Sequence, residues 1–145
     1  FGTAGLTPAY AWVSLDDDGT SGTGEMIFGV GTSAVTSTSY NMVVTHDSST
    51  NGVRIHSQLD GVYKVVGAWV IRDGSADFDC DINVDGSTVH TIQARIHSAV
   101  DPVERTQQYV GTINSGSYVT AHLDATSTVN VSYDPGSTIL VERLS

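Results

Sequence analysis

The stretch from Gly61 to Arg72, GVYKVVGAWVIR, predicts a β-strand that is apolar on both faces. Alternate side chains of a strand point to opposite sides, which gives two sets here: Tyr63, Val65 and Trp69, and Lys64, Val66, Ala68 and Val70. A strand of an antiparallel sheet usually buries only one face. Because the chain has little helix signal, the second face is predicted to be covered by another subunit. The pattern leaves open which of the two sets faces the core.

The composition is typical of an all-β domain. The chain has 145 residues, of which 39% are hydrophobic and only 15% are charged, with 15 Gly. Ser, Thr, Val and Gly are plentiful, whereas good helix formers such as Lys, Glu, Leu and Met are scarce. We therefore expect one domain over residues 1–145, in which residues 1–8 form an N-terminal arm or linker.

The charge and the cysteine count exclude several classes of protein. The formal net charge is −10, so nucleic acid and anionic membranes would be repelled, since binding to phosphates rests on Lys and Arg. No apolar run approaches the length of a membrane span. Cys80 is the single cysteine, which excludes an intrachain disulfide scaffold and fits folding in a reducing compartment.

Turn signals divide the chain into about eleven short strands, a spacing typical of a β-sandwich or barrel. The predicted strands cover residues 9–15, 25–30, 40–45, 53–58, 61–72, 77–84, 88–97, 105–113, 118–123, 128–133 and 138–144. Two low-complexity stretches, residues 16–24 and 31–39, are predicted to be surface loops, since they offer too little apolar surface to bury.

One hairpin, at Val84-Asp85-Gly86-Ser87, can be predicted in register. A Gly in the left-handed position of the loop would pair Val84 with Thr88. Counting outward matches the apolar sides as Ile82 with His90, Cys80 with Ile92 and Phe78 with Ala94. The polar sides then match as Asp81 with Thr91, Asp79 with Gln93 and Asp77 with Arg95. A slip of one residue would place carboxylates opposite apolar side chains, so the register is well specified.

The order of these motifs resembles the jelly-roll domains of the C1q and tumour-necrosis-factor (TNF) type. It comprises an early PAYAWV strand from Pro8, a Gly61-Val62-Tyr63 opening after an Asp-Gly turn, an NVDG hairpin and a closing TILVERLS strand. The turn at Asn114-Ser115-Gly116-Ser117 departs from the family, which often has an acid where Ser117 stands. The resemblance implies two stacked antiparallel sheets and a compact homotrimer. It assigns residues 9–15, 61–72, 105–113 and 138–144 to the inner sheet around the threefold axis.

The implied trimer interface draws on apolar and half-apolar side chains of those inner strands. Its candidate residues are Tyr10, Trp12, Lys64, Val66, Ala68, Val70, Tyr109 and Leu140.

The low Lys content, the loops rich in Ser, Thr and Gly and the lone cysteine are similar to the versions of this domain in tailed-bacteriophage virions. The resemblance thus predicts a virion structural protein, a capsid-decorating (cement) or fibre domain assembled in the host cytoplasm, whose partners are capsid or tail proteins. The alternative is a carbohydrate- or receptor-binding adhesion domain of a tail fibre or bacterial surface protein, with a host surface glycan as partner.

Metal and catalytic sites are weakly indicated. Asp16, Asp17 and Asp18 in a Gly-rich loop are candidate cation ligands, against which stands the simpler interpretation of a solvated acidic loop. The run Asp77, Asp79 and Asp81 begins like a calcium loop but lacks its Gly and its final Glu. No nucleophile motif or phosphate loop is present. We expect no cofactor and no enzymatic activity; a glycan-cleaving pair of carboxylates is the remaining catalytic alternative.

Overall fold

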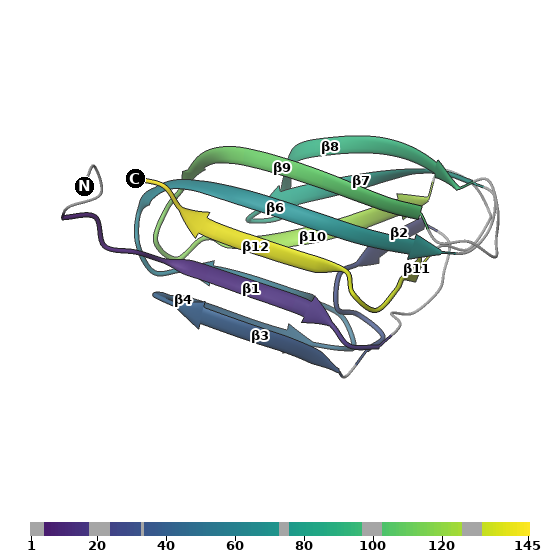
Figure 1. Cartoon of the computed structure of the whole chain (residues 1–145), viewed down its shortest axis with the longest axis horizontal. Coiled ribbons are helices and arrows are strands. Elements are labelled where there is room, and N and C mark those ends of the chain that lie inside the picture. The colour runs from purple at the N-terminus through teal and green to yellow at the C-terminus, as the bar shows by residue number, and fades with distance from the viewer. Residues whose placement is uncertain (1–4, 18–23, 33, 73–75, 97–102, 126–131) are drawn as a thin grey trace.

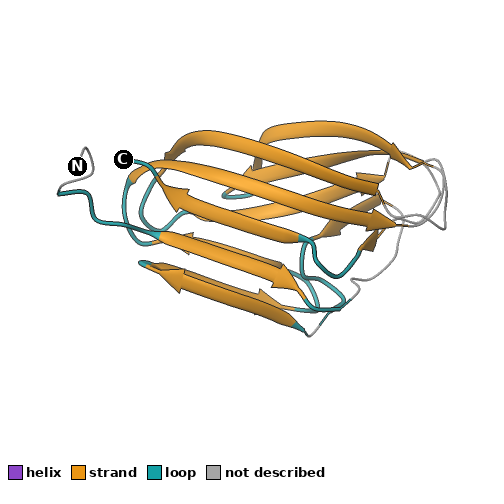
Figure 2. Cartoon of the chain, viewed as in Figure 1, coloured by secondary structure: helices purple, strands orange, loops and turns teal. Residues whose placement is uncertain are grey.

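The computed structural model describes residues 5–17, 24–32, 34–72, 76–96, 103–125 and 132–145. Within these residues the chain forms twelve strands, and no helix is present that could cross a membrane. The strands build a two-layered antiparallel sandwich whose long axis follows the strands (Figure 1; Figure 2). The start of β1 (Tyr10–Leu15) and the C-terminus lie at the same end of the sandwich (Figure 1).

The first sheet contains the strands that the resemblance assigned to the inner sheet. Along it the order is β9 (Val103–Ile113), β6 (Gly61–Arg72), β12 (Thr138–Arg143), β1 (Tyr10–Leu15) and β3 (Val35–Tyr40). A short strand, β11 (Ser132–Tyr133), continues the β12 side of β6 at its far end. The assignment of β1, β6, β9 and β12 to one sheet is thereby confirmed.

The second sheet closes the sandwich from the other side. Its order is β4 (Met42–Asp47), β5 (Gly52–Ser57), β10 (Tyr118–Ala125), β7 (Ala76–Val84) and β8 (Ser87–Ile96). The strand β2 (Gly24–Ile27) pairs with β10 beyond the end of its pairing with β5. Two sheets with this strand order form a jelly-roll sandwich, the fold class expected.

The core lies between the sheets and is centred on an aromatic cluster. The rings of Phe28, Trp69 and Tyr133 contact one another, with centroid separations of 5.4–5.7 Å. Trp69 can lie flat along the sheet because Gly67 has no side chain: a Cβ there would fall 2.0 Å from the indole. Burying such large rings supplies much of the hydrophobic stabilisation of the sandwich.

The structure settles which face of β6 meets the core. Tyr63, Val65 and Trp69 are at most 1% exposed and point into the sandwich. The opposite set, which includes Lys64 and Val66, is only half-buried and points away from the second sheet. The strand is therefore covered on one side by this chain and left uncovered on the other.

A buried amide ties the two sheets together where β9 approaches the β7–β8 pair. The Oε1 atom of Gln107 accepts a hydrogen bond from Trp69 Nε1 at 3.0 Å. Its Nε2 atom donates to the Cys80 carbonyl at 2.8 Å and lies 3.0 Å from His90 Nδ1. His90 thus lies on the inward side of β8, as the predicted register required, with its ring partnered rather than free.

Two predictions about strands were wrong in detail. Residues 31–39 were predicted to be a loop, but Val35–Tyr40 forms the edge strand β3. Apart from Val35 its side chains are exposed, so backbone pairing with β1 holds it in place rather than burial, and no hydrophobic pattern marks it.

The β7–β8 hairpin also differs from the predicted register at its tip. All inner pairs are as predicted, from Ile82 with His90 to Asp77 with Arg95, but Val84 pairs with Ser87 instead of Thr88. Asp85 and Gly86 both have positive φ, at 51° and 81°, as in a two-residue type I′ turn. A β-bulge between Ile82 and Asn83 shifts the register by one residue, so that the pairs from Ile82 outward are still those predicted.

Candidate functional site

Seven of the eight candidate interface residues lie together on one surface, the outer face of the first sheet. We use "outer face" for the side chains of that sheet that point away from the second sheet. Register and burial place Tyr10, Trp12, Lys64, Val66, Ala68, Val70 and Leu140 there.

Tyr109 does not belong to this surface. It stands opposite Val65 on β6 and packs against the core cluster. Its side chain folds back over Gly111, where a Cβ would come 2.0 Å from the Tyr109 hydroxyl. Sequence alone placed it on an inner-sheet strand but could not show which side of that strand it takes, so we leave it out of the interface.

The outer face is organised in cross-strand rows of contrasting size. One row is Tyr40, Tyr10, Glu142, Lys64 and Val110. The next is Thr38, Trp12, Leu140, Val66 and Gln108. The third, Thr36, Ser14, Thr138, Ala68 and Thr106, contains only small side chains. Two rows of large side chains therefore stand beside a row of small ones.

Large apolar side chains of this face are open to solvent. Tyr10, Trp12, Tyr40 and Val110 are 40%, 37%, 52% and 50% exposed. The rings of Tyr10 and Tyr40 stack with their centroids 6.2 Å apart and an interplanar angle of 24°. A group of large exposed apolar side chains on one face is typical of an interaction site.

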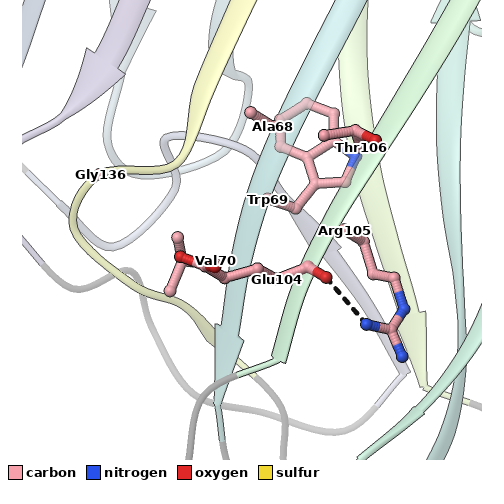
Figure 3. Close-up of a pocket in the computed structure, with 7 residues that line it drawn as sticks. All are labelled: Ala68, Trp69, Val70, Glu104, Arg105, Thr106 and Gly136. Atoms are coloured by element: carbon pink, nitrogen blue, oxygen red, sulfur yellow. Dashed lines mark hydrogen bonds between the residues drawn. The ribbon is translucent and has the colours of Figure 1, made fainter.

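A hollow of about 350 Å³ opens on the same face, beside the row of small side chains. Figure 3 shows its walls: β6 contributes Ala68 and Val70, β9 contributes Glu104 and Thr106, and the turn before β12 contributes Gly136. The Arg105 guanidinium is bonded to the Glu104 carbonyl at 2.8 Å (Figure 3). The hollow has an apolar floor and hydroxyl and carboxylate oxygens at its rim.

The outer face of the second sheet has the opposite character. Glu25, Asp124 and Asp79 stand side by side across β2, β10 and β7, with Asp81 one row away. Burial raises the pKa of the Asp124 carboxyl, and the charges of Glu25, Asp79 and Asp81 raise it further. His122 Nδ1 lies 3.2 Å from a carboxylate oxygen of Glu25. This face is polar and acidic.

A smaller hollow, of about 100 Å³, also lies on the second sheet. The Arg54 guanidinium lies 4.3 Å from the centre of the Tyr118 ring, and its Nη2 donates to Asn51 Oδ1. Thr120 and His122 complete the polar part of the wall. The Nε atom of Arg54 is buried and has no partner within the described residues.

The structure gives no metal centre among the residues that it describes. Asp16 Oδ2 accepts a hydrogen bond of 2.6 Å from Thr36 Oγ1, Asp17 is exposed, and Asp18 lies outside the described residues. Neither hollow contains a pair of carboxylates, since Glu104 is the one acid in the first and the second has none. Cys80 is fully buried, and burial raises the pKa of its thiol to about 12.

Sequence reasoning missed part of the outer face. Tyr40 was assigned to a strand start, but its place beside Tyr10 follows from β3, which was not predicted. Glu104 and Thr106 were not singled out, because a hollow depends on which rows of side chains meet across strands. The one signal available was the small size of Ala68 within a strand of large residues.

No protein-family model matches the sequence, and no curated protein does. Solved structures are similar in fold at low identity. The Eiger TNF of S. frugiperda superposes with a TM-score of 0.63 at 15% identity, over 96% of this chain and 94% of that one. Murine APRIL at pH 8.5 gives a TM-score of 0.63 at 13% identity, over 95% of this chain and 100% of that one. The chain therefore has the TNF-like jelly-roll fold.

Proposed function

We propose that this chain is a homotrimeric structural and binding domain of a virion, a capsid-decorating or fibre domain, held together by the outer face of its first sheet. The observation that carries the trimer is the difference between the two outer faces. Domains of this fold are typically homotrimers that bind protein partners, which supports the proposal.

The distribution of acidic residues indicates which face is buried between subunits. The chain has 16 Asp and Glu residues, yet among the described residues the strands of the first sheet carry only Glu104 and Glu142 on the outer face. Asp16, just past the end of β1, adds one carboxylate at the edge of this face, where it is bonded to Thr36. Glu142 lies 3.8 Å from Lys64, which partly offsets its charge. Carboxylates are depleted at the core of protein interfaces and aromatic residues are enriched there. The first sheet therefore has the composition of an interface, and the second that of a solvent-facing surface.

The trimer is tested by its mass and by charged substitutions. The wild-type chain should sediment at three times 15.3 kDa. Leu140→Asp or Val66→Asp should dissociate the trimer, since each places a carboxylate in the Trp12–Leu140–Val66 row, which the proposed trimer buries. Val43→Asp is the matched control, because Val43 is 43% exposed on β4 of the other sheet. A stable wild-type monomer at micromolar concentration would contradict the proposal.

The virion setting is supported by composition rather than by geometry. Lys64 is the single lysine, Cys80 the single cysteine, and the loops are rich in Ser, Thr and Gly. In this role the buried faces hold the trimer, and loops at one end contact capsid or tail proteins. Immunogold labelling of virions with antibodies against the purified domain tests the location, and a gene beside those for capsid or tail proteins is the expected context. Labelling confined to a bacterial cell surface would contradict it.

The second hollow favours one alternative, a carbohydrate- or receptor-binding adhesion domain. An aromatic ring with Arg54, Asn51 and His122 around it offers hydrogen bonds of the kind that hydroxyl groups need, on the face left open in the trimer. A glycan array probed with the trimer tests this function. Binding lost with Tyr118→Ala and kept with Val43→Ala supports it, and an array without signal contradicts it.

A further inference from the structure

The second hollow, on the outward side of the second sheet, lies where that sheet forks. Strand β10 pairs with β5 at Tyr118 and Val119, and with β2 from His122 onward. Thr120 lies between the two pairings and has no cross-strand partner on that side among the described residues. The outward side chains of β10 at this fork, which alternate with core residues, form one wall of the hollow.

Arg54 reaches the hollow from β5, and two contacts hold its guanidinium in place. The guanidinium carbon lies 4.3 Å from the centre of the Tyr118 ring, and Nη2 donates to Asn51 Oδ1 at 3.2 Å. A guanidinium carries several N–H donors, and Asn51 is the only acceptor that the described part of the chain gives it. The Nε–H group is buried without a partner, whereas most buried donors in native proteins have one. Arg54 therefore keeps oriented donors that the chain itself does not use.

The hollow is free of carboxylates, although the chain has a net charge of −10. No Asp or Glu side chain lines it, and none of the described residues forms an ion pair with Arg54. By contrast, Lys64 and Arg72 each face an acid, Glu142 and Asp134. The positive charge of Arg54 is thus uncompensated beside an open hollow, which favours an anionic ligand.

We propose that the second hollow binds a carboxylate, and that the glycan recognised there carries an acidic sugar. This inference rests on the adhesion alternative given above and specifies the class of its ligand. The planar fork of an arginine matches a carboxylate, and such charge-assisted hydrogen bonds are about twice as strong as neutral ones. The Thr120 hydroxyl and the Asn51 amide, at the wall of the hollow, are placed for the hydroxyl groups of the same sugar.

The size and the aromatic lining of the hollow favour an anionic group over a neutral sugar ring. The hollow measures about 100 Å³, whereas pockets that enclose a drug-sized ligand measure about 300–1,000 Å³. A carboxylate and its neighbouring carbon fit this space, with the rest of the sugar outside. The Arg54 guanidinium already covers a face of the Tyr118 ring, so that face is closed to a stacked sugar.

His122 separates the hollow from the acidic row of the same sheet. Its Nε2 lies 3.0 Å from Thr120 Oγ1, at the wall of the hollow, and its Nδ1 lies 3.2 Å from a carboxylate oxygen of Glu25. Glu25 does not line the hollow. The imidazole thus lies between Thr120 and Glu25, which sets the acidic row apart from the proposed carboxylate.

NMR titration with paired sugars that differ in one group tests the carboxylate. Glucuronate and galacturonate carry a carboxylate where glucose and galactose carry a hydroxymethyl group, and each is added to the isotope-labelled wild-type protein. At least one of the two uronates should shift the amide signals of Arg54, Tyr118 and Thr120 in a saturable way, whereas its neutral partner should leave them in place at the same concentration. Equal shifts from both members of a pair, or none from either uronate, would overturn the inference.

Two further measurements identify the source of the signal. Inorganic phosphate, added at the same concentration, detects general anion binding, and shifts as large as those from the uronates would overturn the carboxylate assignment. On the glycan array, signal from glycans with acidic sugars supports the inference. Signal confined to neutral glycans would leave the adhesion function standing and overturn the inference, and an array without signal would contradict both.

Variants test the role of Arg54. Arg54→Gln should weaken uronate binding at least tenfold, because it removes both the charge and the planar fork. Gln93→Glu is the matched control, since it changes the net charge by the same amount at an exposed site on β8 of the same sheet, and it should leave binding unchanged. Equal binding by Arg54→Gln and the wild type, or an equal loss in Gln93→Glu, would contradict the inference.

A second variant keeps the test decisive if Arg54→Gln does not fold. Tyr118→Leu keeps the arginine but removes the ring that holds its guanidinium, and should weaken uronate binding several-fold. Circular dichroism shows whether each variant is folded. A folded Tyr118→Leu protein that binds uronate as the wild type does would show that the oriented guanidinium is not the binding group.

Discussion

The side chain of Gln107 joins the two sheets through hydrogen bonds, and its replacement tests how much one buried amide contributes. Gln107→Leu leaves Trp69 Nε1, the Cys80 carbonyl and His90 Nδ1 without this partner. Each buried polar group left unpaired costs about 1–3 kcal/mol, so we expect the free energy of unfolding to fall by about 3 kcal/mol. Chemical denaturation measures it, with Gln93→Leu, at an exposed site on β8, as the control. Equal losses in the two variants would contradict the role assigned to Gln107.

Cys80 provides a probe of opening, because it is the single thiol of the chain and is fully buried. Burial, together with the nearby charges of Asp81 and Asp79, raises the pKa of its thiol to about 12. The thiolate is the reactive form, so the native protein should not react with a thiol reagent at pH 8, whereas the denatured protein should react at once. Mass spectrometry over time checks this, and rapid labelling of the native protein would show that β7 is open to solvent.

At the scale of the strand, the acidic row across β2, β10 and β7 should cost stability. Like charges directly opposite each other on neighbouring strands destabilise a sheet by about 0.2–1 kcal/mol. Because the pKa of Asp124 is raised in the folded state, its folded form is favoured at low pH and loses stability as the pH rises through that pKa. Asp124→Asn should therefore raise the melting temperature at pH 7, and the gain should vanish well below the ordinary pKa of 3.8, where the carboxyl is protonated in both states.

The control for this prediction is Asp17→Asn, which removes one charge from an exposed site at the end of β1. It changes the net charge by the same amount without relieving a facing carboxylate. If both variants raise the melting temperature equally, the effect comes from net charge and the row itself contributes nothing.

The elements that could be predicted from the sequence are those in which the side chains facing the core form a regular apolar pattern. The inner register of the β7–β8 hairpin follows from alternation, which breaks if a strand slips by one residue. The placing of β1, β6, β9 and β12 in one sheet followed from the resemblance to TNF-type domains instead. Strand β3 was not predicted, because its Ser and Thr side chains are exposed and therefore give no apolar pattern. The hairpin tip escaped as well, because Asp85 adopts a positive φ that sequence permits but does not require.

At the scale of the whole molecule, the candidate site is partly visible in sequence. The alternation of β6 separates Tyr63 from Val66, but only the position of the second sheet shows that Val66 is the uncovered one. The hollow needs more, since it arises where the small side chain of Ala68 meets Thr106 across strands far apart in sequence. A hollow on a sheet depends on which residues of several strands stand opposite one another, and the residue pattern of one strand does not determine this register.

The net charge of −10 on each chain gives a last prediction, about the trimer as a whole. Three such chains repel one another at long range, whereas the proposed interface is mostly apolar. Salt screens the repulsion, with a Debye length of about 30 Å at 0.01 M and about 10 Å at 0.1 M, and leaves apolar burial intact. The dissociation constant of the trimer should therefore fall as salt rises from 0.01 to 0.2 M, as measured by sedimentation equilibrium. An interface built on ion pairs would weaken instead, and that result would place the contact on a face other than the outer face of the first sheet.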